Sequence, residues 1–215
     1  MIYSTMCIGT EWCTKYAQNI NAFSKNNKVY VLTDKPSYFQ NCNYIEYKRD
    51  VFSYYEKINL ITNLLETYKE RITYVDADLL DTRINTEFVY DSDSLYTYDV
   101  YDSNDGRITK YFGEYEKSKI LEVFSNINLS NLPNFYIDEK IISLPYLDKL
   151  SDITEDINTL QPLLENLLGS VPMNENLDKY SKIGIGYGEG WVLNAICSKY
   201  NIHAKSLDWI KKTII

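Results

Sequence analysis

Two aspartates, Asp76 and Asp78, directly follow a short apolar run and form the first candidate site. The run Ile72–Val75 is β-branched and aromatic, which is typical of a buried strand in a parallel sheet. If the aspartates continue that strand, their side chains share one face of it. Ligands of open α/β sheets bind beyond the carboxyl ends of the strands, and paired carboxylates suit Mg²⁺ or Mn²⁺ with a phosphorylated ligand. The alternative is that the triplet only solvates a turn.

Glu189 is the second candidate, because it stands between Gly188 and Gly190 ahead of a helical apolar pattern over 191–200. A carboxylate at the start of a helix is stabilised by the helix dipole, and this is the structural explanation. The flanking glycines serve no capping need, however, and they suit a loop that presses against a ligand. Both interpretations of Glu189 stay open.

The elements that would position these residues begin with a β-α-β pattern. The spacing predicts a strand over 1–8, a helix that Thr10 caps, a strand over 28–32 and a weaker strand over 44–47. Short connections between such elements are typical of a parallel sheet with right-handed crossovers.

A long amphipathic helix is predicted from Val51 to Tyr68, with Asp50 as its cap, and it leads directly to the acidic strand. Lys57 lies off the apolar stripe of this helix, where a solvated lysine is the usual case. Further strands are expected over 95–101, 141–144 and 202–207, and further helices over 113–126, 152–168 and 190–200. The predicted fold class is α/β, with a mixed, mostly parallel central sheet flanked by helices.

Composition restricts the classes of partner. The chain has 215 residues, enough for one domain, and its net charge of -8 argues against binding nucleic acid or an anionic membrane surface. No apolar run reaches the length of a membrane span, and no signal peptide precedes the first strand. The four cysteines show no metal-binding spacing and fall largely on apolar positions, which suggests buried free thiols in a reducing compartment. We therefore expect a soluble, cytoplasmic protein.

These features together resemble the GT-A fold glycosyltransferases, which use nucleotide sugars. The resemblance rests on the β-α-β opening, the long helix, the strand ending Val75-Asp76-Ala77-Asp78 and the helix start Gly-Glu-Gly-Trp-Val-Leu-Asn at 188–194. It implies a single GT-A-like (Rossmann-like) domain over 1–215, with a nucleotide-binding half at 1–81 and an acceptor and sugar half at 82–215. Length and composition are also similar to glycosyltransferase domains that large algal (chlorella) viruses use on capsid glycans, which implies the host cytoplasm.

The resemblance implies catalytic and metal-binding roles for the acids. Asp78 would coordinate Mn²⁺ or Mg²⁺ between the two donor phosphates, and Asp76 would contact the ribose, or the metal through water. Glu189 would face the transferred sugar. The pair Leu193-Asn194 is similar to one that follows this acid in retaining members, which favours a retaining reaction.

The resemblance also implies a binding site for the rest of the donor. Thr5, Cys7 and Gly9 at the tip of the first strand, with Asp34 after the second, would hold the nucleoside. Lys57 would supply a cation to the donor phosphate or sugar. The implied activity is metal-dependent transfer from a nucleotide-diphosphate sugar, with UDP-sugars favoured, to a glycan or glycoprotein acceptor.

The sequence departs from the family pattern in several places. Gly190 stands where glutamine often follows the acid, and no histidine-containing tail supplies a third metal ligand. The acceptor half is short, which suggests a minimal module or one domain of a longer polypeptide. Two alternatives stay open. One is an inactive nucleotide-sugar-binding module; the other is a haloacid-dehalogenase-type phosphatase, although that class has its acidic motif near the first strand and Thr or Val where Leu80 stands here.

Overall fold

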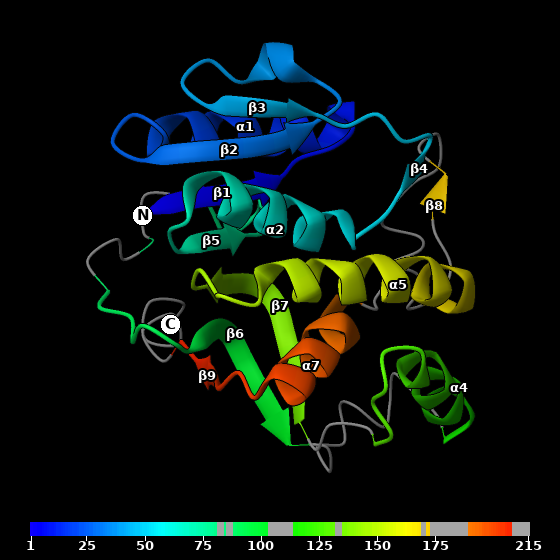
Figure 1. Cartoon of the computed structure of the whole chain (residues 1–215). Coiled ribbons are helices and arrows are strands. Elements are labelled where there is room, and N and C mark those ends of the chain that lie inside the picture. Colours follow the sequence, from blue (N-terminus) through cyan, green and yellow to red (C-terminus); the bar gives the residue numbers. More distant parts are fainter. Residues whose placement is uncertain are drawn as a thin grey trace.

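The computed structural model describes residues 1–80, 84, 88–102, 114–131, 135–168, 171–172 and 189–207 (Figure 1). Its main sheet has seven strands in the order β3-β2-β1-β5-β7-β6-β9. β7 runs antiparallel to both its neighbours, and every other neighbouring pair is parallel. The mixed, mostly parallel sheet predicted from the sequence is therefore confirmed. Its strands are β1 (Ile2–Met6), β2 (Lys28–Thr33), β3 (Asn43–Glu46), β5 (Ile72–Val75), β6 (Leu95–Asp102), β7 (Phe135–Leu144) and β9 (Ala204–Ser206).

Helices cover both faces of this sheet. They are α1 (Thr10–Phe23), α2 (Glu56–Tyr68), α4 (Glu114–Ser125), α5 (Leu150–Leu168) and α7 (Glu189–Tyr200), with a short 3-10 helix, η1 (Pro36–Tyr38). The apolar side chains of α2, α4, α5 and α7 share one core with one face of the sheet. Those of α1 pack into a second core on the opposite face. Among the described helices, none combines the length and apolarity that crossing a bilayer requires.

The starts of two helices differ from the prediction. α2 begins at Glu56 rather than Val51, because Val51–Phe52 form a short strand, β4, antiparallel to β8 (Val171–Pro172). Asp50 is therefore not the cap of α2, and its cap position has no side-chain hydrogen bond. α1 is preceded by Gly9 rather than capped by Thr10. Gly9 has a φ of 85°, a conformation that residues with a side chain rarely adopt.

β7 carries an irregularity that the sequence does not predict. Thr97 of β6 pairs with Ile142, but Asp99 pairs with Asp138, so β7 advances by four residues where β6 advances by two. β5 pairs with β7 only over 141–144, and the first part of β7 therefore runs on past the carboxyl end of β5. Extra residues of this kind re-aim side chains and interrupt pairing, and they are frequent beside functional sites.

Candidate active site

The acidic pair lies in a turn, not on the strand. β5 ends at Val75, and the backbone N–H groups of Leu79 and Leu80 both donate to the carbonyl oxygen of Asp76, at 2.9 and 3.1 Å. The backbone N–H of Asp76 donates to the carbonyl oxygen of Lys140 on β7, at 2.8 Å. The expectation that the two aspartates share a strand face is therefore wrong. They nevertheless lie at the carboxyl end of β5, as predicted.

Lys57 is buried, with a side chain only 2 % exposed, and its ammonium lies 3.3 Å from Oδ1 of Asp76. The hydroxyl of Tyr74 donates to the same oxygen at 3.0 Å. The Lys57 ammonium also lies 5.3 Å from the centre of the Tyr74 ring and 5.4 Å from that of Tyr54. A buried ammonium needs such partners because its desolvation is costly. The solvated lysine expected from the helical pattern is thus wrong.

Asp78 differs from Asp76 although only one residue separates them. Asp78 is exposed, and its side chain makes no hydrogen bond or ion pair with any residue that the structure describes. One acid of the pair is therefore fixed by the protein interior, while the other faces solvent at the same edge of the sheet.

Asp138 and Lys140 on β7 join this site, and sequence reasoning missed them. The ammonium of Lys140 lies 3.7 Å from Oδ2 of Asp138, and the backbone N–H of Lys140 donates to Oδ1 at 3.2 Å. Burial lowers the pKa of Lys140, but the electrostatic effects of Asp138, Tyr98, Glu139 and Asp76 together raise it by more, so the ammonium keeps its proton. The signal in the sequence was an Asp-Glu-Lys triplet inside an otherwise apolar strand.

The proposed nucleoside-binding residues divide into buried and accessible ones. Thr5 and Cys7 are completely buried, and the backbone N–H of Cys7 donates to the carbonyl of Leu32 at 3.0 Å. Gly9 and Asp34 are both partly exposed, and the backbone N–H of Gly9 donates to Oδ1 of Asp34 at 2.8 Å. No atom lies within 4 Å of the point where a β-carbon of Gly9 would be, so this side of the turn is open.

The Cys7 thiol also contacts Cys13 on α1. The Cys13 thiol donates to the carbonyl oxygen of Cys7 at 3.3 Å. The adjacent Cys13 thiol raises the pKa of Cys7, as does burial, and the adjacent Cys7 thiol lowers the pKa of Cys13. Cys7, Cys13 and Cys197 are buried free cysteines, and Cys42 is partly exposed. The prediction of buried free thiols is therefore confirmed for three of the four.

Glu189 is the first residue of α7, and its side chain lies outside the described residues. The structure does show how α7 is attached to the sheet. The buried side chain of Asn194 accepts a hydrogen bond through Oδ1 from the backbone N–H of Ile137, at 3.0 Å. This bond fixes α7 to β7 one residue before Asp138, beside the irregular part of the strand.

The acidic turn offers carboxylate oxygens, which suit a divalent cation, but it does not offer a complete set of protein ligands. In the ranges that the structure describes, no three His, Cys, Asp or Glu side chains converge as metal ligands. Two neighbouring carboxylates nevertheless fit an ion that takes its remaining oxygens from a bound phosphate, which is how Mg²⁺ is commonly held. Asp78 would be the direct protein ligand, and Asp76 would contact the ion through water.

Comparison with families and with curated protein sequences found no match. Among solved structures, the chain is similar to the galactosyltransferase LgtC in complex with donor and acceptor sugar analogs, at 11% identity and a TM-score of 0.40, covering 78% of this chain and 70% of that one. It is also similar to the glycosyltransferase GlyE of Streptococcus pneumoniae, at 11% identity and a TM-score of 0.46. That match covers 96% of this chain, which spans 45% of GlyE.

Proposed function

We propose that the chain is a glycosyltransferase that binds a nucleotide-diphosphate sugar at the carboxyl ends of β1, β2 and β5. One observation carries the proposal. At this edge of the sheet, the turn after β5 holds Asp76 against buried Lys57 and leaves Asp78 exposed to solvent. The carboxyl edge of a parallel sheet is where α/β proteins bind nucleotides, and an exposed carboxylate there suits a metal-bound diphosphate.

The acids would hold Mn²⁺ or Mg²⁺, with Asp78 as the direct ligand and Asp76 beside it. When bound, the metal would act as a Lewis acid that neutralises the diphosphate leaving group. Lys140, whose side chain is 53% exposed, is an accessible cation beside the turn and would contact the phosphates. Lys57 is too deeply buried to do so and would act through Asp76, which changes the role that the sequence suggested for it.

The sugar would lie between the acidic turn and the start of α7. Glu189 would stabilise the positive charge that develops on the sugar ring, in a retaining reaction. Gly9 and Asp34 would border the nucleoside, with Thr5 and Cys7 as the buried support beneath them. We favour a UDP-sugar as donor and a glycan or glycoprotein as acceptor, in the cytoplasm.

The phosphatase alternative finds no support at the end of β1. That class attacks phosphate with a carboxylate near the first strand, but the residues after β1 here are Cys7, Ile8 and Gly9. The acidic turn follows β5 instead. An inactive nucleotide-sugar-binding module would differ from an enzyme in one measurable respect, because it would bind the donor without hydrolysing it.

A thermal-shift screen of UDP-, GDP- and dTDP-sugars, with and without Mn²⁺, tests the proposal. A ligand that binds only the native state raises the melting temperature. We expect one donor to do so only with Mn²⁺, in the wild type and in Asp148→Asn, which removes an exposed acid between β7 and α5. Asp78→Asn should abolish the shift. An equal shift in Asp78→Asn, or no shift with any donor, would contradict the proposal. Release of free nucleotide would then separate an enzyme from a binding module.

A further inference from the structure

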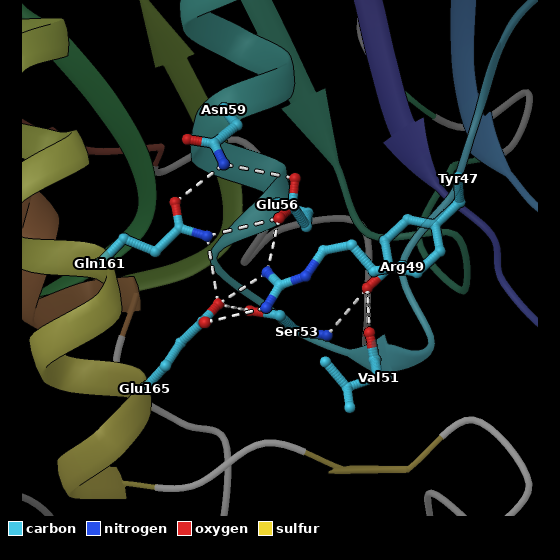
Figure 2. Close-up of polar contacts among 8 residues, drawn as sticks. All are labelled: Tyr47, Arg49, Val51, Ser53, Glu56, Asn59, Gln161 and Glu165. Atoms are coloured by element: carbon cyan, nitrogen blue, oxygen red, sulfur yellow. Dashed lines mark hydrogen bonds and ion pairs between the residues drawn. The ribbon is translucent and has the colours of Figure 1, made fainter.

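A second cluster of charged and polar residues lies at the start of α2, the helix that carries Lys57 (Figure 2). The guanidinium of Arg49 binds Glu165 of α5 with both terminal nitrogens, at 2.9 Å each. Its Nη1 atom also lies 2.7 Å from Oε1 of Glu56, the first residue of α2. Parallel contacts of this kind fix the orientation of an arginine and a carboxylate more closely than a single contact does.

Neutral side chains complete the cluster. Gln161 donates to Oε1 of Glu56 at 3.3 Å and to Oε1 of Glu165 at 3.1 Å, and Asn59 donates to Oε2 of Glu56 at 3.3 Å. The hydroxyl of Ser53 donates to Glu165 as well. All four carboxylate oxygens therefore have a donor within the cluster (Figure 2). A cluster satisfied in this way holds its own elements together and has no need of a ligand.

The cluster joins segments that are distant in the sequence. Arg49 belongs to the connection after β3, and Glu165, which is 116 residues away, lies on α5. Burial raises the pKa of Glu165, but the hydrogen bonds from Arg49, Ser53 and Gln161 lower it by more, so the carboxylate stays charged. The cluster therefore ties the first turn of α2 to a helix from the second half of the chain.

The first turn of α2 has no side-chain cap, and its backbone N–H groups donate to carbonyl oxygens just before the helix, from Glu56 to Ser53 at 3.3 Å and from Lys57 to Tyr54 at 3.2 Å. Hydrogen bonds that span three residues have poorer geometry than those of a regular α-helix, so the contacts of Glu56 with Arg49 and Gln161 strengthen the hold on this turn. Glu56 and Lys57 are consecutive in this turn, and consecutive helical side chains point about 100° apart. Glu56 is directed to Arg49 and Gln161, while Lys57 is directed to Asp76. Holding Glu56 therefore also sets the direction of Lys57.

We propose that Arg49 is a positioning residue that acts through Glu56 and Lys57 to hold the carboxylate of Asp76 in place. The effect of Arg49 on donor binding rests on the proposed function, but its effect on the positions of Lys57 and Asp76 does not. Loss of Arg49 frees the first turn of α2 and exposes Lys57, and Asp76 then loses a fixed partner.

The test measures the accessibility of Lys57 directly, by acetylation of native protein with N-hydroxysuccinimide acetate and peptide mass spectrometry. Lys48, with a side chain 78% exposed, is the internal reference. In the wild type we expect slow labelling of Lys57. In Arg49→Met, the ratio of Lys57 to Lys48 labelling should rise by about tenfold as the first turn opens. Arg49→Lys should lie between the two, because a single ammonium cannot reproduce the paired contacts.

Lys199→Met is the matched control. The ammonium of Lys199 lies 2.6 Å from Oδ2 of Asp156, and this ion pair ties α7 to α5. Like Arg49→Met, the variant removes an ion pair of α5, but that pair does not involve α2. This variant should leave the Lys57 labelling ratio unchanged. Glu165→Gln is a second test that keeps the shape of the cluster and should raise the ratio. Unchanged labelling in both Arg49→Met and Glu165→Gln, or an equal rise in Lys199→Met, would overturn the proposal.

Donor binding is a separate measurement. If the wild type gives a Mn²⁺-dependent thermal shift with a nucleotide sugar, Arg49→Met should reduce that shift and Lys199→Met should not. If the wild type gives no shift with any donor, the proposed function fails, while the labelling ratio still decides whether Arg49 positions Lys57.

Discussion

The ammonium of Lys57 lies 3.3 Å from Oδ1 of Asp76, with the lysine side chain 2% exposed and the aspartate 28% exposed. This pair connects the start of α2 to the turn at the end of β5. The pair also gives the two aspartates of the turn different physical roles. The charge of Asp76 compensates a buried cation, whereas the charge of Asp78 compensates nothing among the described residues.

Asp76→Asn should therefore destabilise the protein much more than Asp78→Asn. The first change leaves a buried ammonium without its carboxylate, which costs about 3 kcal/mol in the free energy of unfolding. The second changes an exposed side chain and should cost less than about 0.5 kcal/mol. Urea unfolding followed by circular dichroism measures both. Equal losses in the two variants would show that the pair does not stabilise the fold.

The coupling between Lys57 and Asp76 can be measured by a double-mutant cycle. Lys57→Met removes the buried charge, so adding Asp76→Asn to it should cost far less than Asp76→Asn alone. We expect a coupling energy of about 2 kcal/mol from the unfolding free energies of the four proteins. Additive losses would mean that the two side chains stabilise the protein independently.

Asn194→Ala should loosen the attachment of α7 to β7. It leaves the buried N–H of Ile137 without its acceptor, at a cost of about 2 kcal/mol in the free energy of unfolding. Amide hydrogen exchange should quicken at Ile137. Ser125→Ala is the control, because Ser125 makes an exposed hydrogen bond within its own helix, to Glu122. Unchanged exchange at Ile137 would show that Asn194 does not hold β7.

Glu165→Gln should make the stability of the protein less dependent on acid pH. Burial raises the pKa of Glu165, but its hydrogen bonds, first that of Arg49, bring it below the ordinary 4.5. A lowered folded pKa gives stability that is present above 4.5 and is lost as the pH falls through the folded pKa.

The measurement is urea unfolding of the wild type and Glu165→Gln between about pH 3 and pH 7. The free energy of unfolding of the wild type should exceed that of the variant by about 2 kcal/mol near neutral pH, and this difference should shrink below pH 4.5. The exposed Asp148→Asn should show little change in either range. A difference that stays constant down to pH 3 would contradict a charged, hydrogen-bonded Glu165.

The four thiols should differ in reactivity. In native protein, an aromatic disulfide reagent should modify Cys42 first, because Cys7, Cys13 and Cys197 are buried. Burial also raises the pKa of Cys42 overall, so its reaction should be slow at neutral pH and faster as the pH rises. Mass spectrometry of the modified peptides identifies the site. Early modification of Cys197 would be inconsistent with its position inside the core.

The elements that follow simple periodicities could be predicted from the sequence. The apolar runs of β1, β2 and β5 and the helical spacing of α1 and α5 are local patterns, and the structure has these elements close to where they were expected. The position of Asp76 at a strand end also followed from its neighbours in the chain, since charge after a buried run marks the end of the run.

The remaining features depend on contacts between distant segments. Val51 fits a helical stripe, but it pairs with Pro172, so α2 starts later. Lys57 looks like a surface residue in its own helix, and its burial is explained by partners that include Asp76, 19 residues on. Asp138 and Lys140 enter the site because β7 pairs with β5 and runs on past its end, and pairing between strands so far apart in the sequence has no short-range signal.

The opposite direction of β7 determines which loop borders the turn at Asp76. The carboxyl ends of β1, β2 and β5 lie at the edge of the sheet that carries the acidic turn. Because β7 is antiparallel to β5, its amino end lies at that edge. The whole β6–β7 connection, with α4 inside it, therefore starts and finishes on the side of the acidic turn (Figure 1). Exchanging this single connection between related chains would alter what can approach the turn, while the order of the strands would stay as it is.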